Sequence, residues 1–223
     1  MKTTTRLILV STVCLAWSAF GEEDFSLSKR WRGRIDIGGS LPQDPSLSEI
    51  GGPVTGGGKM DLSAGMQFDL ALEYRITPWL SVGGELGFTF NEVNSVGNWS
   101  YPDSALSQMS MMANVMVEYP RGRLVPFAGV GAGGVFSSLT FGNYYDYYYS
   151  DSDGEGTDFA PAFQAFAGIR YGFAEQWSIG VTYRFLATAS QDWNVEWWNG
   201  ANFRLGVDNV CIHSICLVMT GSF

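Results

Sequence analysis

Lysine is scarce in this 223-residue chain, where it occurs only at Lys2, Lys29 and Lys59. Acidic side chains outnumber basic ones, 22 to 13, and the formal net charge is −9 at pH 7. A protein that binds nucleic acid needs a cluster of basic side chains to displace counterions from phosphates. The sequence has no such cluster, so we expect no nucleic-acid partner.

Long hydrophobic runs are missing after residue 21, although a transmembrane helix needs about 20 predominantly apolar residues. The first residues differ, because a basic start precedes the apolar stretch Leu7–Trp17 and the small residues of Ala19-Phe20-Gly21. This order is typical of a secretory signal peptide. We expect residues 1–21 to be cleaved before Glu22, leaving an exported domain of residues 22–223.

Cysteine is also rare, and after residue 21 it occurs at Cys211 and Cys216. An oxidising compartment favours a disulfide. In one extended strand, however, five residues span about 16 Å, whereas a disulfide needs Cα atoms within about 7 Å. Only a bend between the two residues would permit the bond, so the free and the bridged forms both stay open.

Glycine and aromatic residues are abundant, with 28 glycines and an aromatic share of 15%. Apolar residues alternate with small or polar ones, which is the pattern of a strand with two different faces. We predict strands at residues 30–40, 60–76, 79–90, 107–119, 124–137, 159–173, 177–186 and 211–223. Many of them suit the roughly 9–11 residues of a membrane-crossing strand.

The connections between these strands alternate in length. Residues 77–78, 120–123 and 174–176 are short connections, whereas 41–59, 91–106, 138–158 and 187–210 are long. A membrane barrel has short turns on the periplasmic side and long loops outside, while a soluble β-sandwich has no reason for this rhythm. We therefore predict an all-β fold, an eight-stranded antiparallel transmembrane β-barrel with up-and-down topology, in the outer membrane.

The polar faces of the predicted strands carry the charged residues, five arginines and six carboxylates. They are Arg32, Arg34, Asp36, Asp61, Asp69, Glu73, Arg75, Glu85, Glu118, Arg170 and Arg184. In a membrane barrel the apolar face meets lipid and the polar face lines the lumen. An eight-stranded lumen is only wide enough for side chains, so these charges should pair and plug it.

Aromatic residues gather near the predicted strand ends, at Trp31, Tyr74, Trp79, Tyr119, Phe173, Trp177 and Phe185. They match the girdles that membrane barrels place at the headgroup level, although aromatics also favour strands in general.

The chain resembles the OmpA-like and opacity-protein family of outer-membrane barrels. The resemblance lies in residues 74–81, in residues 125–133 and in His213-Ser214 before the last strand. Ile215, Leu217, Met219 and the final Phe223 alternate like the insertion signal read by the barrel-assembly machinery, although Thr220-Gly221-Ser222 lacks the usual aromatic. The family has no single activity, so the resemblance implies a surface protein without naming its role.

A catalytic role would have to involve His213, the one histidine of the chain, with Ser214 and an acid such as Asp208 or Glu196. A nucleophile must lie within hydrogen-bond reach of its base. Neighbouring residues of a strand point to opposite faces, so His213 and Ser214 should diverge. We therefore expect that the protein is not an enzyme.

The long connections hold the candidates for recognition: Tyr144, Tyr145, Tyr147, Tyr148, Tyr149, Trp193, Trp197 and Trp198. Such aromatics give large contact area at low entropic cost, or they rest on lipid headgroups. Asp151, Asp153 and Glu155 resemble the start of a calcium loop. Ala162 stands where the loop's bidentate Glu is expected, so we favour a solvated acidic loop and no cofactor.

Two classes of function remain, a structural or surface-interaction barrel that acts through its loops and a narrow channel or transporter for small solutes. The inward charges favour the first. The expected partners are outer-membrane lipids, the barrel-assembly machinery during insertion and a surface ligand that the sequence does not identify.

Overall fold

The computed structural model describes residues 30–50, 58–97, 99–120, 122–142, 154–197 and 202–223. In this part of the chain, no helix has the length and hydropathy that crossing a membrane would require.

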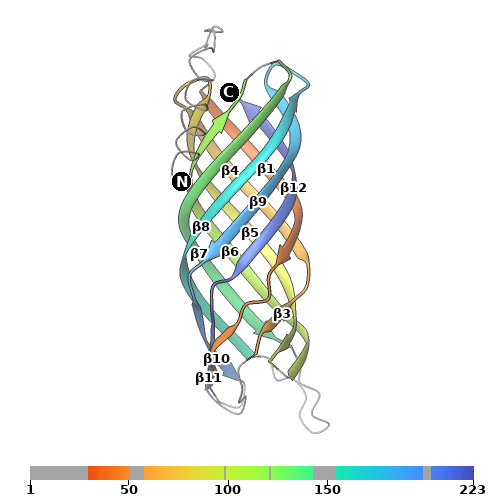
Figure 1. The fold of residues 1–223 in the computed structure, drawn as a ribbon, viewed down its shortest axis with the longest axis vertical. Coiled ribbons are helices and arrows are strands. Elements are labelled where there is room, and N and C mark those ends of the chain that lie inside the picture. Colours follow the sequence, from red (N-terminus) through yellow and green to blue (C-terminus); the bar gives the residue numbers. More distant parts are fainter. Residues whose placement is uncertain (1–29, 51–57, 98, 121, 143–153, 198–201) are drawn as a thin grey trace, which may run out of the picture.

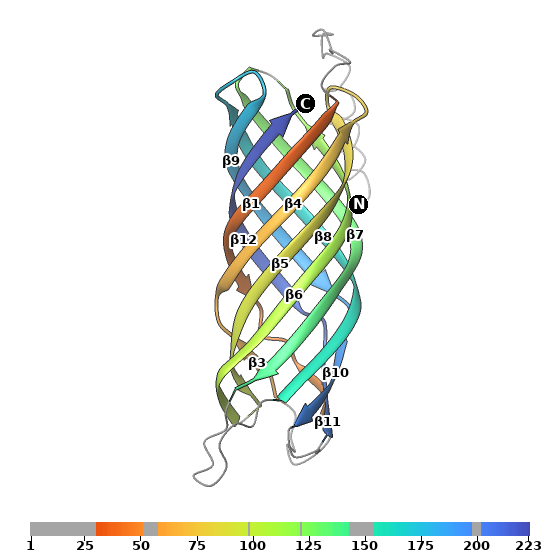
Figure 2. The same ribbon diagram turned by 180° about the vertical axis from the view of Figure 1, so that it is seen from behind.

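Eight antiparallel strands close into a barrel (Figures 1 and 2). They are β1 (Trp31–Pro42), β4 (Gly65–Arg75), β5 (Leu80–Val96), β6 (Trp99–Glu118), β7 (Leu124–Phe141), β8 (Gly154–Gly172), β9 (Trp177–Thr188) and β12 (Cys211–Ser222). Each pairs with the next in this order, and β12 returns to β1. The sheet therefore has no free edge among these strands, as a spanning sheet requires in lipid.

The strands are strongly inclined to the long axis of the barrel (Figure 2). When the residue partners are followed from strand to strand around the barrel, a path that starts at Cys211 of β12 returns to β12 at Gly221. The stagger of the closed sheet is therefore ten residues. The path runs through Ala187, Phe163, Ala132, Ala113, Gly84, Leu72 and Gly33. A closed sheet with such a stagger must tilt, typically by about 35–45°.

The start of β1 and the end of β12 lie at one end of the barrel, where Trp31 exchanges backbone hydrogen bonds with Phe223. The short connections, residues 76–79, 119–123 and 173–176, join strands at this same end. We call it the proximal end and the opposite one the distal end. The eight strands and the alternation of short and long connections confirm the predicted fold.

Two of the long connections, by contrast, contain strands that the sequence did not predict: β2 (Leu47–Ile50), β10 (Gln191–Trp197) and β11 (Asn202–Val207). A fourth short strand, β3 (Met60–Leu62), is the first part of the predicted strand 60–76. β5 to β8 have 17 to 20 residues and continue beyond the 11- or 12-residue strands β1, β4, β9 and β12.

The additional strands take the places that the shorter strands leave at the distal end. β3 pairs with β5, β10 with β8, β11 with β10, and β2 with β11, while a bridge joins Ser46 to Lys59 beside β3. The four short strands and the distal parts of β5 to β8 thus extend the barrel wall, and we call this extension the distal tier. The eight-stranded ring between the distal tier and the proximal end is the proximal tier.

The distal tier encloses an apolar core. Its buried residues include Met60, Leu62, Val93, Leu106, Leu139, Phe141, Trp193, Val195, Leu205, Val207 and Ile212. Trp193 is fully buried, and its indole Nε1 donates a hydrogen bond of 3.0 Å to Ser137 Oγ. The prediction of Trp193 as a residue of a recognition loop is therefore wrong, because the side chain fills this core.

The predicted strand 60–76 is divided, and the two parts face differently. Met60 and Leu62 are buried, whereas Met66 is exposed, because residues 63–64 interrupt the alternation. The break is fixed at Gly65, where a Cβ would collide with the carbonyl oxygen of Phe90. Asp61 is consequently exposed and accepts a hydrogen bond from Asn94, so its predicted place in the lumen is wrong.

The outer face of the proximal tier is apolar. Ile35, Leu70, Leu86, Met111 and Ile179 are each between 41% and 50% exposed. Trp31, Tyr119, Phe173 and Trp177 are exposed near the proximal end, while Phe185 is half-buried towards the other end of its strand. An apolar surface of this extent, bordered by aromatics, is what a lipid bilayer covers.

On the outward face of β4, introducing a charge should destabilise the protein more than removing side-chain volume. Leu70→Arg places a cation against lipid, which costs about 2–4 kcal/mol near the bilayer midplane. Leu70→Ala removes only contacts with lipid and should cost less. Urea unfolding of both variants in lipid vesicles, followed by tryptophan fluorescence, measures the difference. Equal stability of the two would mean that Leu70 does not face lipid.

The core of the distal tier depends on Trp193. Trp193→Ala should destabilise the distal tier by about 3–5 kcal/mol, since it leaves a large cavity. The proximal tier does not contain this side chain, so the gel shift between heated and unheated protein should persist. Hydrogen exchange of β10 and β11 amides measures the effect, with Trp177→Ala on the outer proximal face as the control. Unchanged protection of these amides in Trp193→Ala would contradict the role of this core.

Candidate functional site: the closed lumen

The charged side chains of the proximal tier point into the barrel. Nine of them are buried: Arg32, Arg34, Asp36, Asp69, Glu73, Glu85, Glu118, Arg170 and Arg184. The side chain of Arg75 is 23% exposed. The inward direction follows from the strand period, since residues 32, 34 and 36 alternate with outward residues 31, 35 and 37 and glycine 33 on β1.

The charges nearest the proximal end gather around Glu118 of β6. Arg32 approaches Glu118 to 2.8 Å, Arg75 to 3.8 Å, and Arg170 donates a short hydrogen bond to the same carboxylate. Arg32 also binds Glu73 at 2.8 Å. This proximal cluster therefore holds three arginines and two carboxylates.

A second cluster lies deeper, around Glu85 of β5. Both Arg34 and Arg184 form short ion pairs with Glu85. Arg184 also lies 2.9 Å from Asp36 and 3.5 Å from Asp69. This central cluster holds two arginines and three carboxylates, the reverse of the proximal one.

Uncharged inward side chains complete the central cluster. Gln164 and Asn114 donate hydrogen bonds to Glu85, at 2.9 and 3.2 Å. The guanidinium carbons of Arg34 and Arg184 lie 5.0 and 5.5 Å from the centroid of the Phe166 ring, within the range of a cation–π contact. Gln164, Asn114 and Phe166 were not predicted as site residues, although each lies on the polar face of its strand, which was the available signal.

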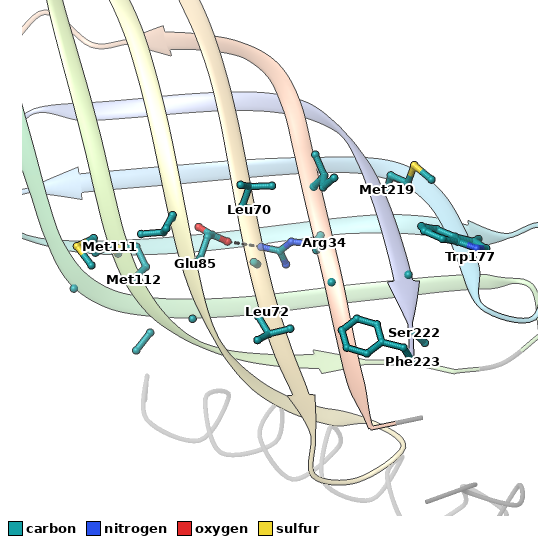
Figure 3. A pocket seen from close by; sticks show the side chains of 18 of the residues that line it. Arg34, Leu70, Leu72, Glu85, Met111, Met112, Trp177, Met219, Ser222 and Phe223 are labelled. Carbon is teal, nitrogen blue, oxygen red and sulfur yellow. Dashed lines mark hydrogen bonds and ion pairs between the residues drawn. The ribbon is translucent and has the colours of Figure 1, made fainter. Parts of the chain in front are cut away.

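The two clusters form one network, because Glu73 binds Arg32 through one oxygen and Arg34 through the other, at 2.8 and 3.0 Å. Figure 3 shows the pair Arg34–Glu85 between β1 and β5, with Leu70 and Leu72 on the intervening strand β4. With Asp61 outside it, the network contains five arginines and five carboxylates. Such buried pairs are weak evidence for stability, because desolvation offsets their attraction, but they fill the lumen with mutually bound side chains.

His213 and Ser214 lie on opposite faces of β12. Ser214 is buried and contacts Gln67 inside the barrel. His213 lies outside, where its ring nitrogens are 2.7 Å from Gln43 Nε2 and 2.6 Å from the Tyr183 hydroxyl. Asp208 and Glu196 are exposed at the distal end. These four residues are thus not assembled as a hydrolytic triad.

The two cysteines also lie on opposite faces of β12, Cys216 buried and Cys211 half-buried, and both are free thiols. Tyr144 to Tyr149, Asp151, Asp153 and Trp198 lie outside the described residues, as does the side chain of Trp197. Glu155 is exposed and accepts a hydrogen bond from Ser138 at 3.3 Å. Within the described ranges, no three potential ligands gather as a metal site would require.

The network should respond strongly to loss of its central carboxylate. Glu85→Gln leaves two buried guanidinium groups short of one charge, and breaking a buried pair in this way typically costs about 3–5 kcal/mol. Asp61→Asn, at an exposed carboxylate, should change the free energy of unfolding by less than about 0.5 kcal/mol. Urea titration of both variants in vesicles checks this. Similar small effects of both variants would mean that Glu85 does not hold the two arginines.

Comparison with known proteins also indicates an outer-membrane β-barrel. The outer membrane protein beta-barrel domain matches residues 7–208, whereas the comparison with curated proteins gives no match. Among solved structures, Neisserial surface protein A is similar with a TM-score of 0.55 and 13% identity, over 86% of this chain and 97% of that one. OprG from Pseudomonas aeruginosa has a TM-score of 0.56 and 13% identity, over 86% and 96%.

A third similar structure is that of the outer membrane protein AlkL, with a TM-score of 0.52 and 20% identity, over 92% of this chain and 97% of that one. At these low identities, the similar structures support the fold and nothing more. The family match, by contrast, extends over residues 7–208, which is most of the chain. The chain belongs to the outer membrane protein β-barrel domain family.

Proposed function

We propose that the protein is a non-conducting surface barrel of the outer membrane, which acts through the residues of its distal end. The observation that carries this proposal is the filling of the barrel in both tiers. Ion pairs occupy the proximal lumen, and the apolar core around Trp193 occupies the distal one.

The filling of the two tiers opposes conduction in different ways. In the proximal tier, a passing ion would have to displace arginine–carboxylate contacts of 2.8 to 3.0 Å in a narrow lumen. In the distal tier, an ion would have to lose its hydration among apolar side chains, which costs many kcal/mol. The alternative, a narrow channel or transporter, would need both fillings to rearrange.

We also propose that the protein is not an enzyme. Support comes from the divergence of His213 and Ser214, which separates the one histidine from its neighbouring nucleophile. Recognition is assigned to the distal end, where β7 ends and β2, β10 and β11 extend the wall, and to the tyrosine-rich residues 144–149, which follow β7 in the sequence.

Export and assembly form the remaining part of the proposal. Residues 1–21 act as a cleaved signal peptide, and residues 22–223 enter the outer membrane with the help of the barrel-assembly machinery. Phe223 is 64% exposed at the end of β12, where an insertion signal remains accessible to that machinery. Lipids then cover the apolar outer face.

Planar-bilayer recording tests the proposal directly. The purified protein should show no steady large conductance, because both tiers are filled. A stable ion-selective conductance that disappears in Arg184→Gln would overturn the proposal and support the channel.

A deletion provides the matching test of recognition. Residues 144–152 are replaced by a short Gly-Ser linker, which leaves β8 intact because it begins at Gly154. Folding and heat-modifiable mobility should persist, and binding of the protein to cell or lipid surfaces should fall. A scrambled sequence of the same nine residues serves as the composition control.

A further inference from the structure

The proximal mouth of the lumen contains a cavity of about 160 Å³. Three arginines line it, Arg32, Arg75 and Arg170, together with Glu118. Gln176 and Trp177, which are exposed near the proximal turn, form part of its rim. A cavity of this size holds several water molecules or one small polyatomic ion.

Arg170 brings an unused hydrogen-bond donor to this cavity. Its side chain is 6% exposed, and its Nη2 donates to Glu118. Its Nη1 is buried and has no hydrogen-bond partner among the described residues. A buried guanidinium nitrogen without an acceptor costs free energy, so an acceptor inside the cavity would be favourable.

The charge around the cavity is also positive on balance. Glu118 is shared by Arg32, Arg75 and Arg170, and Glu73 divides its oxygens between Arg32 and Arg34. The exposed Glu175 at the rim is the other acidic group that lines the cavity, and solvent screens it. An anion would therefore meet an excess of guanidinium groups.

We propose that the proximal mouth is a binding site for one oxyanion, a phosphate or phosphate-like group. Guanidinium groups bind such oxygens through directed, charge-assisted hydrogen bonds, and Arg170 Nη1 supplies the free donor. The anion stays at the mouth, because Asp36, Asp69 and Glu85 of the central cluster repel it from the deeper lumen. The site is separate from the distal end, to which the proposed function assigns recognition.

The phosphate group has two possible sources, free phosphate on the proximal side of the membrane and the headgroup of a phospholipid. The rim contains Trp177, which is 46% exposed beside the outer apolar face, so a headgroup at the membrane surface can reach it. Both sources present the same oxygens to Arg170.

The test uses inorganic phosphate and the refolded protein in a neutral glycosidic detergent that contains no phosphate. Isothermal calorimetry should show saturable binding to one site. Arg170→Gln should weaken the affinity by about tenfold or more, the usual contribution of a hydrogen bond to a charged group. Arg204→Gln in the distal tier, whose side chain pairs with Asp192 at 3.1 Å, should leave the affinity unchanged.

A second variant keeps the test decisive if Arg170→Gln fails to fold. Glu175→Gln removes an exposed rim carboxylate and should tighten phosphate binding by about two- to fivefold, the range of exposed charge pairs. Competition by added phosphatidylcholine would identify the headgroup as the source, and its absence would identify free phosphate. The proposal is wrong if the unaltered protein shows no saturable binding, or if neither Arg170→Gln nor Glu175→Gln changes the affinity.

Discussion

The closure of β1 on β12 is the constraint on which the rest of the proximal tier depends. Hydrocarbon offers no hydrogen bonds, so every backbone group of a spanning sheet must find a partner within the sheet. Eleven residue pairs, from Arg32–Ser222 to Pro42–Ile212, form this last seam. Closure with eight strands leaves a lumen no wider than its side chains, and arginines and carboxylates placed there find their partners in one another and in inward polar side chains such as Gln164 and Asn114.

Along the same strands, the polarity of the inward and outward faces is reversed between the two tiers. On β5 the inward face carries Glu85 in the proximal tier and Val93 and Val96 in the distal tier. On its outward face, exposed Leu86 and Phe90 give way to Glu92. Lipid outside permits a polar interior, because the apolar face is already removed from water. Water outside requires an apolar interior, because burial must then supply the stabilisation.

This inversion explains what could be predicted from the sequence. The period-2 pattern identified the eight strands, their outward apolar faces and the inward charges from Arg32 to Arg184. The same rule failed at Met60 and Leu62, which alternate with Asp61 in the predicted strand 60–76 and would therefore face lipid, whereas they belong to the distal core. It failed again at Trp193, because a core built by β2, β3, β10 and β11 depends on pairing between distant segments. Those strands have 3 to 7 residues, too few for their own periodicity to show.

The residues of the lumen therefore act as three successive layers rather than as one plug. From the proximal end, an ion meets an excess of arginine around Glu118, then an excess of carboxylate around Glu85, and finally the apolar core around Trp193. A cation is opposed by the first layer and an anion by the second, while neither can keep its hydration shell in the third. Because the Glu73 carboxylate joins the first two layers through Arg32 and Arg34, opening one of them disturbs the other. In the proposed non-conducting barrel, occlusion thus rests on the order of the layers along its axis as much as on the number of ion pairs within it.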